Sequence, residues 1–364
     1  MSDDPSETTP ARSDPLRTRF CELVGCRYPI VQTGMGWVSG ANLTAATSAA
    51  GGFGILAAVT MTPHQLRDAV RGVRQRTDAS FGVNFRADQP DLADRLRFVT
   101  GEGVRLVSFA GAPTRDAITL VHDAGAVVVP TVGARRHAEK MAEWGVDAVI
   151  AQGGEGGGHT GTVPTSLLLP QVVEAVGGEI PVLGAGGFHS GAGLVAALAY
   201  GADGVAMGTR FLLTAESRVP DAVKACYTDA SVFDTVVSTA LDGAPQRVIH
   251  TPTVDGLEKA PTLLKLPAAL RRALAFRRQT GTPLRELVAE GLAMRKSQDL
   301  TWSQLAMAAN APMLINAALV DGDPSVGVLP TGQVTGVIDE LPAVAEAIEE
   351  IVADARATLA RLGA

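Results

Sequence analysis

Residues 181–211 read PVLGAGGFHSGAGLVAALAYGADGVAMGTRF. This stretch holds an apolar run that ends in glycines (181–187), a helical stretch of small apolar residues (193–203) and a second apolar run (204–211). Both runs are continuously apolar rather than alternating, which is typical of strands buried on both faces of a parallel sheet. The stretch therefore predicts one strand–helix–strand unit of an α/β protein.

The same unit repeats in the residues before this stretch. Apolar runs lie at 29–35, 53–58, 81–87, 106–110, 127–132 and 148–154, and helical stretches such as 42–51, 63–76 and 135–145 separate them. Neighbouring runs start 21 to 33 residues apart. Eight such units predict a closed (β/α)8 TIM barrel, whose active site belongs at the carboxyl ends of the strands.

A doubly wound nucleotide-binding sheet is the rival architecture. It requires a G-x-G-x-x-G turn after its first strand, whereas the first predicted strand here ends in GMGW (34–37). A glycine pattern of that spacing at 156–161 runs into Thr162-Val163-Pro164 instead of a helix. A second one, at 191–196, follows an existing glycine turn. Neither pattern lies directly between a strand and a helix, as a dinucleotide-binding turn must, and we therefore reject the dinucleotide-binding fold.

The regular alternation of predicted strands and helices ends after residue 212. We predict that residues 213–310 form a helical, strand-poor substrate or lid region, inserted into a barrel made of residues 16–212 and 311–364. Residues 341–362 have the pattern of an amphipathic C-terminal helix. Residues 1–15 are acidic and poor in apolar side chains, so we expect a disordered lead-in there.

A basic patch lies within the inserted region. From Glu258 to Lys296 the chain carries nine Lys and Arg residues against three Glu, although the whole chain has a net charge of −7. Such a patch is either a solvated helix face or a site for a polyanionic substrate such as a CoA nucleotide. The candidate substrate-binding residues are Arg271, Arg272, Arg277 and Arg278.

Composition narrows the class of protein. The 364 residues are 46% hydrophobic, enough for a full core, and the negative net charge disfavours nucleic acid or an anionic membrane as a partner. No run approaches the ~20 apolar residues that a transmembrane helix needs. The three cysteines have neither paired nor metal-binding spacing, which favours reduced thiols, a cytoplasmic location and no metal. The oligomeric state stays open, with a homodimer as one option.

Two glycine-rich strand ends predict a phosphate site. TIM barrels commonly bind phosphate on the loops after strands seven and eight, often at a helix N-terminus. The seventh run ends in Gly184-Ala185-Gly186-Gly187, where missing side chains let backbone N–H groups approach an anion. The eighth ends in Met207-Gly208-Thr209-Arg210, which offers a bare amide, a hydroxyl and a guanidinium. We expect Gly186, Gly187, Gly208 and Thr209 to bind the phosphate of a cofactor.

Amide side chains end three other predicted strands. We expect Gln32 to end the first strand, Asn84 the third and Gln152 the sixth, where a core would prefer Val or Leu. Buried amides must be paired, so three of them at one end of a barrel indicate a ligand rich in donors and acceptors. A flavin ring fits this description. Each amide alone could instead hold a neighbouring loop.

His159 is the candidate catalytic residue. It lies in AQGGEGGGHTG (151–161), and it is the only histidine on a glycine loop at a predicted strand end. Bare backbone leaves the imidazole open to a ligand, and its ordinary pKa suits proton transfer near neutral pH. Glu155 is either a second functional group or a residue that fixes this loop.

These stretches together resemble the FMN-dependent nitronate monooxygenase family (2-nitropropane dioxygenase-like), which also contains flavin enoyl-ACP reductases. The resemblance runs from about residue 20 onward and rests on PIVQTGM (29–35), AQGGEGGGHTG, GAGGF (184–188) and MGTRF (207–211). It implies that His159 is catalytic and that FMN is bound by Gln32, Asn84, Gln152, Gly157, Gly158, Gly187, Gly208 and Thr209. Two positions depart from the family pattern, Gly156 where Ala is usual and Ser190 where Asp is common.

Further stretches resemble an actinobacterial branch of this family. They are QTGMGW (32–37), MGTRFLLTAESRVPDAVK (207–224) and TWSQ followed by AANAPML (301–314). That branch is similar to CoA-thioester oxidoreductases of steroid-ring breakdown, which implies hydride transfer on a CoA thioester with NADH or NADPH as a transient co-substrate. The alternatives are a nitronate monooxygenase that uses O₂, an enoyl-ACP reductase, and a non-catalytic barrel that binds a phosphate ligand.

Overall fold

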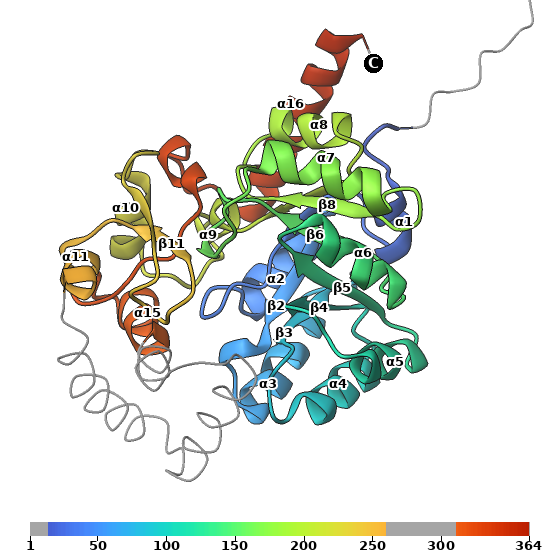
Figure 1. Ribbon diagram of the computed structural model, residues 1–364, viewed down its shortest axis with the longest axis horizontal. Coiled ribbons are helices and arrows are strands. Elements are labelled where there is room, and N and C mark those ends of the chain that lie inside the picture. Colours follow the sequence, from blue (N-terminus) through green and yellow to red (C-terminus); the bar gives the residue numbers. More distant parts are fainter. Residues whose placement is uncertain (1–13, 260–310, 364) are drawn as a thin grey trace, which may run out of the picture.

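The computed structural model describes residues 14–259 and 311–363 and contains a closed parallel barrel (Figure 1). Its strands are β1 (Ile30–Gln32), β2 (Phe53–Ala57), β3 (Gly82–Arg86), β4 (Leu106–Ala110), β5 (Val127–Val132), β6 (Val149–Gln152), β8 (Val182–Ala185) and β9 (Gly204–Met207). They follow one another around the ring, and β9 pairs with β1 to close it. The predicted TIM barrel is confirmed, because each of the eight predicted runs contains one strand.

A short helix closes the amino-terminal end of the barrel. Phe20 of α1 (Arg19–Val24) packs edge to face on Phe53 of β2, with ring centroids 6.0 Å apart, inside the barrel core. Arg105, which directly precedes β4, donates hydrogen bonds to the carbonyl oxygen of Leu23. Because this end is filled, the carboxyl ends of the strands are the side left for a site.

Helices cover the outside of the barrel. Seven of them lie between consecutive barrel strands: α2 (Ala41–Ala49), α3 (Pro63–Arg74), α4 (Leu92–Gly101), α5 (Arg115–Asp123), α6 (Arg135–Glu143), α7 (Thr165–Val176) and α8 (Gly191–Ala199). After β9 comes only α9 (Thr209–Leu212), which is too short to cover a strand. The C-terminal helix α16 (Val344–Leu362) packs on α8 and α2 and so takes the eighth place (Figure 1). The predicted C-terminal helix is confirmed.

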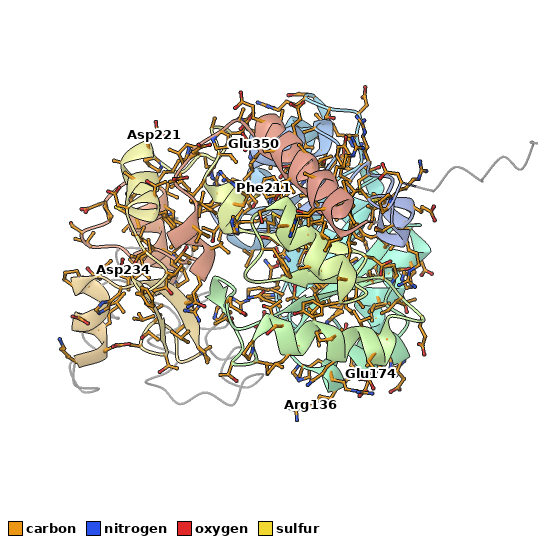
Figure 2. All side chains as sticks on the ribbon, turned by 90° about the horizontal axis from the view of Figure 1, so that it is seen from above. Arg136, Glu174, Phe211, Asp221, Asp234 and Glu350 are labelled. Atoms are coloured by element: carbon orange, nitrogen blue, oxygen red, sulfur yellow. The ribbon has the colours of Figure 1, made fainter. Side chains whose placement is uncertain are left out.

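The chain between α9 and α16 forms a second unit beside the barrel, which we call the lobe (described residues 213–259 and 311–337; Figure 1). It contains α10 (Asp221–Thr228), β10 (Thr235–Ser238), β11 (Gln246–Ile249), α11 (Pro252–Lys259), α15 (Ala311–Leu319) and the 3-10 helix η2 (Gln333–Val337). Figure 2 shows Asp221 and Asp234 of the lobe well apart from Arg136 and Glu174 on the barrel helices.

The described part of the inserted region differs from the prediction in two respects. It contains a strand pair that was not predicted, since β10 and β11 pair as an antiparallel hairpin. The barrel also does not resume at residue 311, because Ala311, Leu314 and Val328 share a small apolar core with Leu241 and Val248 of the lobe. Residues 311–328 are therefore part of the lobe, which is inserted between the eighth barrel strand and its helix. The barrel strands could be predicted because they are regularly spaced in the sequence, and the short strands outside the barrel lack this spacing.

The lobe is tied to the barrel through a strand that the sequence did not indicate. Gly158 and His159 form β7, which pairs with β11, so the order of this small sheet is β10-β11-β7. The glycine loop after β6 thus belongs to both units.

The helices among the described residues are all too short or too polar to span a membrane.

Candidate active site

Gln32 ends β1 and is fully buried. Its Nε2 donates to Ser39 Oγ at 2.8 Å, to the carbonyl oxygen of Ile55 at 3.1 Å and to that of Thr33. Its Oε1 is also buried and has no hydrogen-bond partner within the described ranges. An unsatisfied buried acceptor costs roughly 1–3 kcal/mol, so this oxygen is suited to a ligand N–H.

Gln152 ends β6 as predicted, but the prediction that Asn84 ends the third strand is wrong, because β3 continues to Arg86 and Asn84 is its middle residue. Asn84 Nδ2 donates to Ser108 Oγ at 2.7 Å, and its Cβ lies so close to Gly34 that no side chain fits there. Gln152 Nε2 donates to the carbonyl oxygen of His159 at 2.8 Å. Each amide therefore holds a neighbouring strand or loop, and its role toward a flavin stays a prediction.

The predicted glycines fall into two kinds. A Cβ at Gly157 would come 2.5 Å from Gly332 N, and one at Gly186 would come 2.9 Å from Gly156 N, so these two glycines let loops pack closely. In contrast, Gly158 has open space where a Cβ would be, and at Gly187 the nearest atom is 3.8 Å away. Both have a positive φ (+64° and +83°), and their open faces are suited to a bound ligand.

The two residues that follow Gly208 at the end of β9 make hydrogen bonds within the protein. Gly208 caps α9, but the Thr209 hydroxyl accepts a 3.0 Å hydrogen bond from Gly332 N. The buried Arg210 guanidinium donates to the carbonyl oxygens of Leu213 and Glu340, and burial lowers its pKa. These two side chains therefore hold the lobe and the segment before α16, and the role of Thr209 toward a cofactor phosphate stays a prediction. Residue type alone did not indicate where they point.

Local contacts explain Glu155 and both departures from the family pattern. The Glu155 carboxylate accepts hydrogen bonds from Thr165 N and Oγ1 at the start of α7, so it fixes the loop. Ser190 caps α8 by accepting from Gly193 N at 3.2 Å, a role that Asp also fills. A Cβ at Gly156 would lie 2.7 Å from Gln152 Nε2, so the glycine leaves room for this amide.

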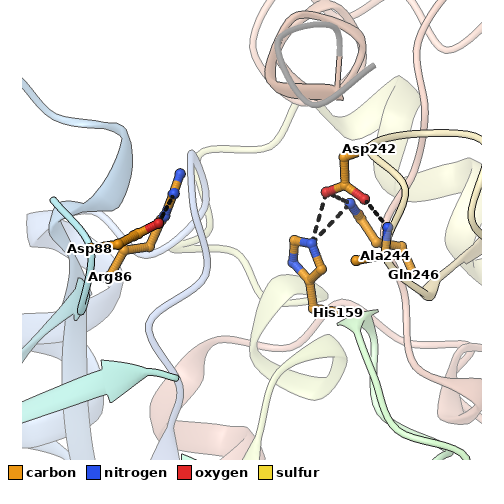
Figure 3. Close-up of polar contacts among 6 residues, drawn as sticks. All are labelled: Arg86, Asp88, His159, Asp242, Ala244 and Gln246. Carbon is orange, nitrogen blue, oxygen red and sulfur yellow. Dashed lines mark hydrogen bonds and ion pairs between the residues drawn. The ribbon is translucent and has the colours of Figure 1, made fainter. Parts of the chain in front are cut away.

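His159 lies at the exposed end of the glycine loop, with 67% of its side chain accessible to solvent. Its Nε2 lies 2.8 Å from Asp242 Oδ2 and 3.3 Å from Gln246 Nε2 (Figure 3). Figure 3 also shows Arg86, at the end of β3, held by Asp88 on the other side of the view. The imidazole is therefore oriented by the lobe and open to solvent, as a group that exchanges protons with a substrate must be.

Asp242 and Gln246 are functional candidates that sequence reasoning missed. Gln246 opens β11 directly opposite His159, and Asp242 lies in the turn between β10 and β11. Burial raises the pKa of Asp242, but the hydrogen bond and electrostatic attraction to His159, together with hydrogen bonds from Ala244 and Gln246, outweigh this effect, so its pKa lies below the usual value. An Asp-Gly pair between two runs rich in β-branched residues signals a hairpin and could have located this turn.

Arg247 is a further link between the lobe and the glycine loop. Its Nη2 donates to the carbonyl oxygen of Gly154 at 2.8 Å, and its Nη1 donates to Thr235 Oγ1 at 3.0 Å. The candidate substrate-binding residues Arg271, Arg272, Arg277 and Arg278 lie outside the described residues, as does most of the predicted lead-in.

The described residues fit the flavin that the family resemblance implies. The unpartnered Gln32 Oε1 offers an acceptor to a ring N–H, and the open turns at Gly158 and Gly187 leave space for a ligand beside backbone amides. These features lie at the carboxyl ends of β1, β6 and β8, around one edge of the barrel. Fold and site together define a TIM-barrel oxidoreductase with a histidine on its β6 loop.

The chain belongs to the nitronate monooxygenase family, whose model matches residues 17–354. Two relatives carry the name (3aS,4S,5R,7aS)-5-hydroxy-7a-methyl-1-oxo-octahydro-1H-indene-4-carboxyl-CoA dehydrogenase. The one from Mycobacterium tuberculosis is 55% identical over 93% of this chain and 96% of its own length. The one from Rhodococcus jostii is 54% identical over 96% of this chain and 98% of its own length. The predicted family and its actinobacterial branch are confirmed.

Solved structures give the same family and fold. FabK from Thermotoga maritima has a TM-score of 0.77 and 33% identity, and the match covers 95% of this chain and 98% of FabK. A nitroalkane oxidase from Streptomyces ansochromogenes has a TM-score of 0.72 and 27% identity, covering 94% of this chain and 99% of that structure. The protein is thus a member of an oxidoreductase family.

Proposed function

We propose that this protein is an FMN-dependent oxidoreductase that transfers a hydride between a CoA-thioester substrate and the flavin. The observation that carries this proposal is the likeness, over nearly the whole chain, to two proteins named carboxyl-CoA dehydrogenases. The site supports it, because the exposed His159 is held by the largely buried carboxylate of Asp242 and directly follows the open glycine turn at Gly158.

The chemistry divides between the cofactor and the chain. FMN, when bound, supplies the acceptor for a hydride. The chain would hold the phosphate on the turns at Gly187 and Gly208, and Gln32 Oε1 would accept a hydrogen bond from the ring. In the oxidation of the substrate, one carbon would give up a hydride, for which FMN supplies the acceptor, and the neighbouring atom would give up a proton to His159; in the reverse direction His159 would return that proton. NADH or NADPH is the proposed partner that exchanges electrons with the flavin.

The first test is anaerobic and uses the protein with its flavin bound. The holoenzyme is mixed separately with NADH, with NADPH and with a small alkyl nitronate, and the flavin absorbance is recorded. Bleaching by a nicotinamide but not by the nitronate is expected. Bleaching by the nitronate alone, with recovery in air, refutes the proposal and favours a nitronate monooxygenase, the candidate that the family name supports.

A second test addresses the CoA part of the substrate. Replacing four of the six arginines of the basic patch by Gln is expected to raise KM for a CoA thioester and to leave the reduction of the flavin by NADH or NADPH unchanged. An equal effect on both reactions counts against a CoA site in this patch. The four residues are Arg271, Arg272, Arg277 and Arg278.

A further inference from the structure

We propose that Asp242 is a positioning residue that fixes the tautomer of His159, with the proton on Nε2, so that Nδ1 is the nitrogen that exchanges a proton with the substrate. The inference rests on the proposed function, in which His159 moves the substrate proton. It specifies which nitrogen of His159 transfers this proton and which residue determines that choice. This residue, Asp242, lies 83 positions further along the chain.

The short contact between the two side chains sets the tautomer. His159 Nε2 lies 2.8 Å from Asp242 Oδ2, the separation of a charge-assisted hydrogen bond. An ionised carboxylate only accepts hydrogen bonds, and the lowered pKa of Asp242 keeps it ionised at neutral pH. The nitrogen must therefore carry the proton. In the neutral imidazole the lone pair is then on Nδ1.

Gln246 offers the only competing arrangement within the described residues, and its geometry is weaker. Its Nε2 lies 3.3 Å from His159 Nε2, which would be a neutral hydrogen bond if that nitrogen were unprotonated. In that case the 2.8 Å contact with Asp242 would join two acceptors and be repulsive. The Gln246 amide has a better acceptor in Asp242 Oδ2, to which it also donates. Gln246 therefore supports the carboxylate.

The carboxylate is held firmly, whereas the imidazole is open. Asp242 Oδ1 accepts from Ala244 N at 3.0 Å, and Oδ2 accepts from His159 and Gln246. The Asp242 side chain is 13% exposed, against 67% for His159. Within the described ranges Nδ1 of His159 has no hydrogen-bond partner, and in Figure 3 this nitrogen is turned away from Asp242. A fixed acceptor on one nitrogen and a free second nitrogen are the arrangement that a proton-transfer histidine needs.

The test is a nitrogen NMR measurement on the holoenzyme labelled with ¹⁵N-histidine. The signal of His159 is identified by its loss in His159→Gln, since the chain has six histidines. In the wild-type protein above the titration range of imidazole, we expect a protonated Nε2 and an unprotonated Nδ1. Asp242→Asn is expected to lose this preference, because an amide can either donate or accept at the same place. Wild-type His159 with its proton on Nδ1 overturns the proposal.

Kinetics give a second, independent readout. Asp242→Asn is expected to lower kcat by about 10- to 100-fold, a part of the general acid–base contribution, with KM nearly unchanged and full flavin content. Asp242→Glu restores a carboxylate and is expected to recover part of both the tautomer preference and kcat. Asp255→Asn is the matched control, since Asp255 pairs with His250 at 2.7 Å outside the site, and it is expected to leave kcat unchanged.

The outcomes separate this inference from the proposed function. If Asp242→Asn folds and changes neither the tautomer nor kcat, Asp242 is not a positioning residue. If Asp242→Asn does not fold, the wild-type tautomer and the Asp242→Glu variant decide. If the wild-type protein turns over no CoA thioester, the proposed function fails, while the tautomer of His159 is still measured directly.

Discussion

Gly187 gives a direct test of the flavin site, because a matched glycine exists elsewhere in the chain. Gly187 follows β8 and Gly145 follows α6, and both have φ of +83°. An L-residue in this left-handed conformation costs about 1–2 kcal/mol. A Cβ at Gly187 would meet its nearest protein atom at 3.8 Å, and one at Gly145 would meet nothing within 4 Å. Neither substitution by Ala adds a steric clash within the described residues.

We therefore expect Gly187→Ala and Gly145→Ala to lower the free energy of unfolding of the flavin-free protein by the same ~1–2 kcal/mol. Only Gly187→Ala places a methyl group on the open face of the predicted phosphate turn. We expect the Kd for FMN to rise at least about tenfold in this variant, equivalent to ~1.4 kcal/mol, and to stay unchanged in Gly145→Ala. Flavin fluorescence during FMN titration measures the Kd, and urea unfolding measures the stability. Equal Kd values in the two variants refute a flavin phosphate at this turn.

Three further predictions follow from the contacts around the β6 loop. His159→Ala is expected to keep FMN bound and to lower turnover by about 10²–10⁴-fold; steady-state kinetics with unchanged rates would remove His159 from the mechanism. Glu155→Ala removes the acceptor for Thr165 N and Oγ1 and is expected to cost about 0.5–2 kcal/mol in urea unfolding. The pKa of Asp242 is lower in the folded protein than in the unfolded chain, where it is about 3.9. The ionised carboxylate therefore stabilises the fold fully above this unfolded pKa, and the stabilisation is lost as the pH falls through the folded pKa. The difference in urea midpoint between wild type and Asp242→Asn is therefore expected to vanish in strong acid, and a difference that grows there contradicts this sign.

The barrel could be predicted from the sequence because its strands repeat a simple physical pattern. Strands buried on both faces need continuous apolar runs, and the glycines at 184–187 and 208 mark their ends. The exact ends of the strands could be predicted less well. The run 29–35 contains a strand of only three residues, because the chain after Gln32 turns into a loop. In the lobe the strands are short and exposed in part, so the same pattern was absent.

The position of a site residue could be predicted only where an amide or histidine side chain falls at the end of a predicted strand. Gln32 and His159 could be placed at the carboxyl edge of the barrel because parallel strands end together there, whereas Asn84 lies two residues before the end of β3. The partners of those residues could not be predicted. Asp242 comes from a turn 83 residues away from His159, and no periodicity links the two positions. Thr209 and Arg210 follow a strand in the expected way, yet their side chains bind Gly332, Leu213 and Glu340.

The place of the lobe in the chain explains how a distant turn reaches the histidine. The lobe departs after β9 and returns at α16, so it begins at the carboxyl end of a barrel strand, the edge where the loop after β6 also lies. A segment inserted at the opposite end would meet α1 and the filled barrel core. From the carboxyl edge, β11 pairs with Gly158 and His159, and this register sets Gln246 opposite the histidine and brings Asp242 within 2.8 Å of it. The backbone pairing of three short strands therefore orients the imidazole, and a change that weakens the β7–β11 pairing should disturb His159 even if every side chain near it is kept.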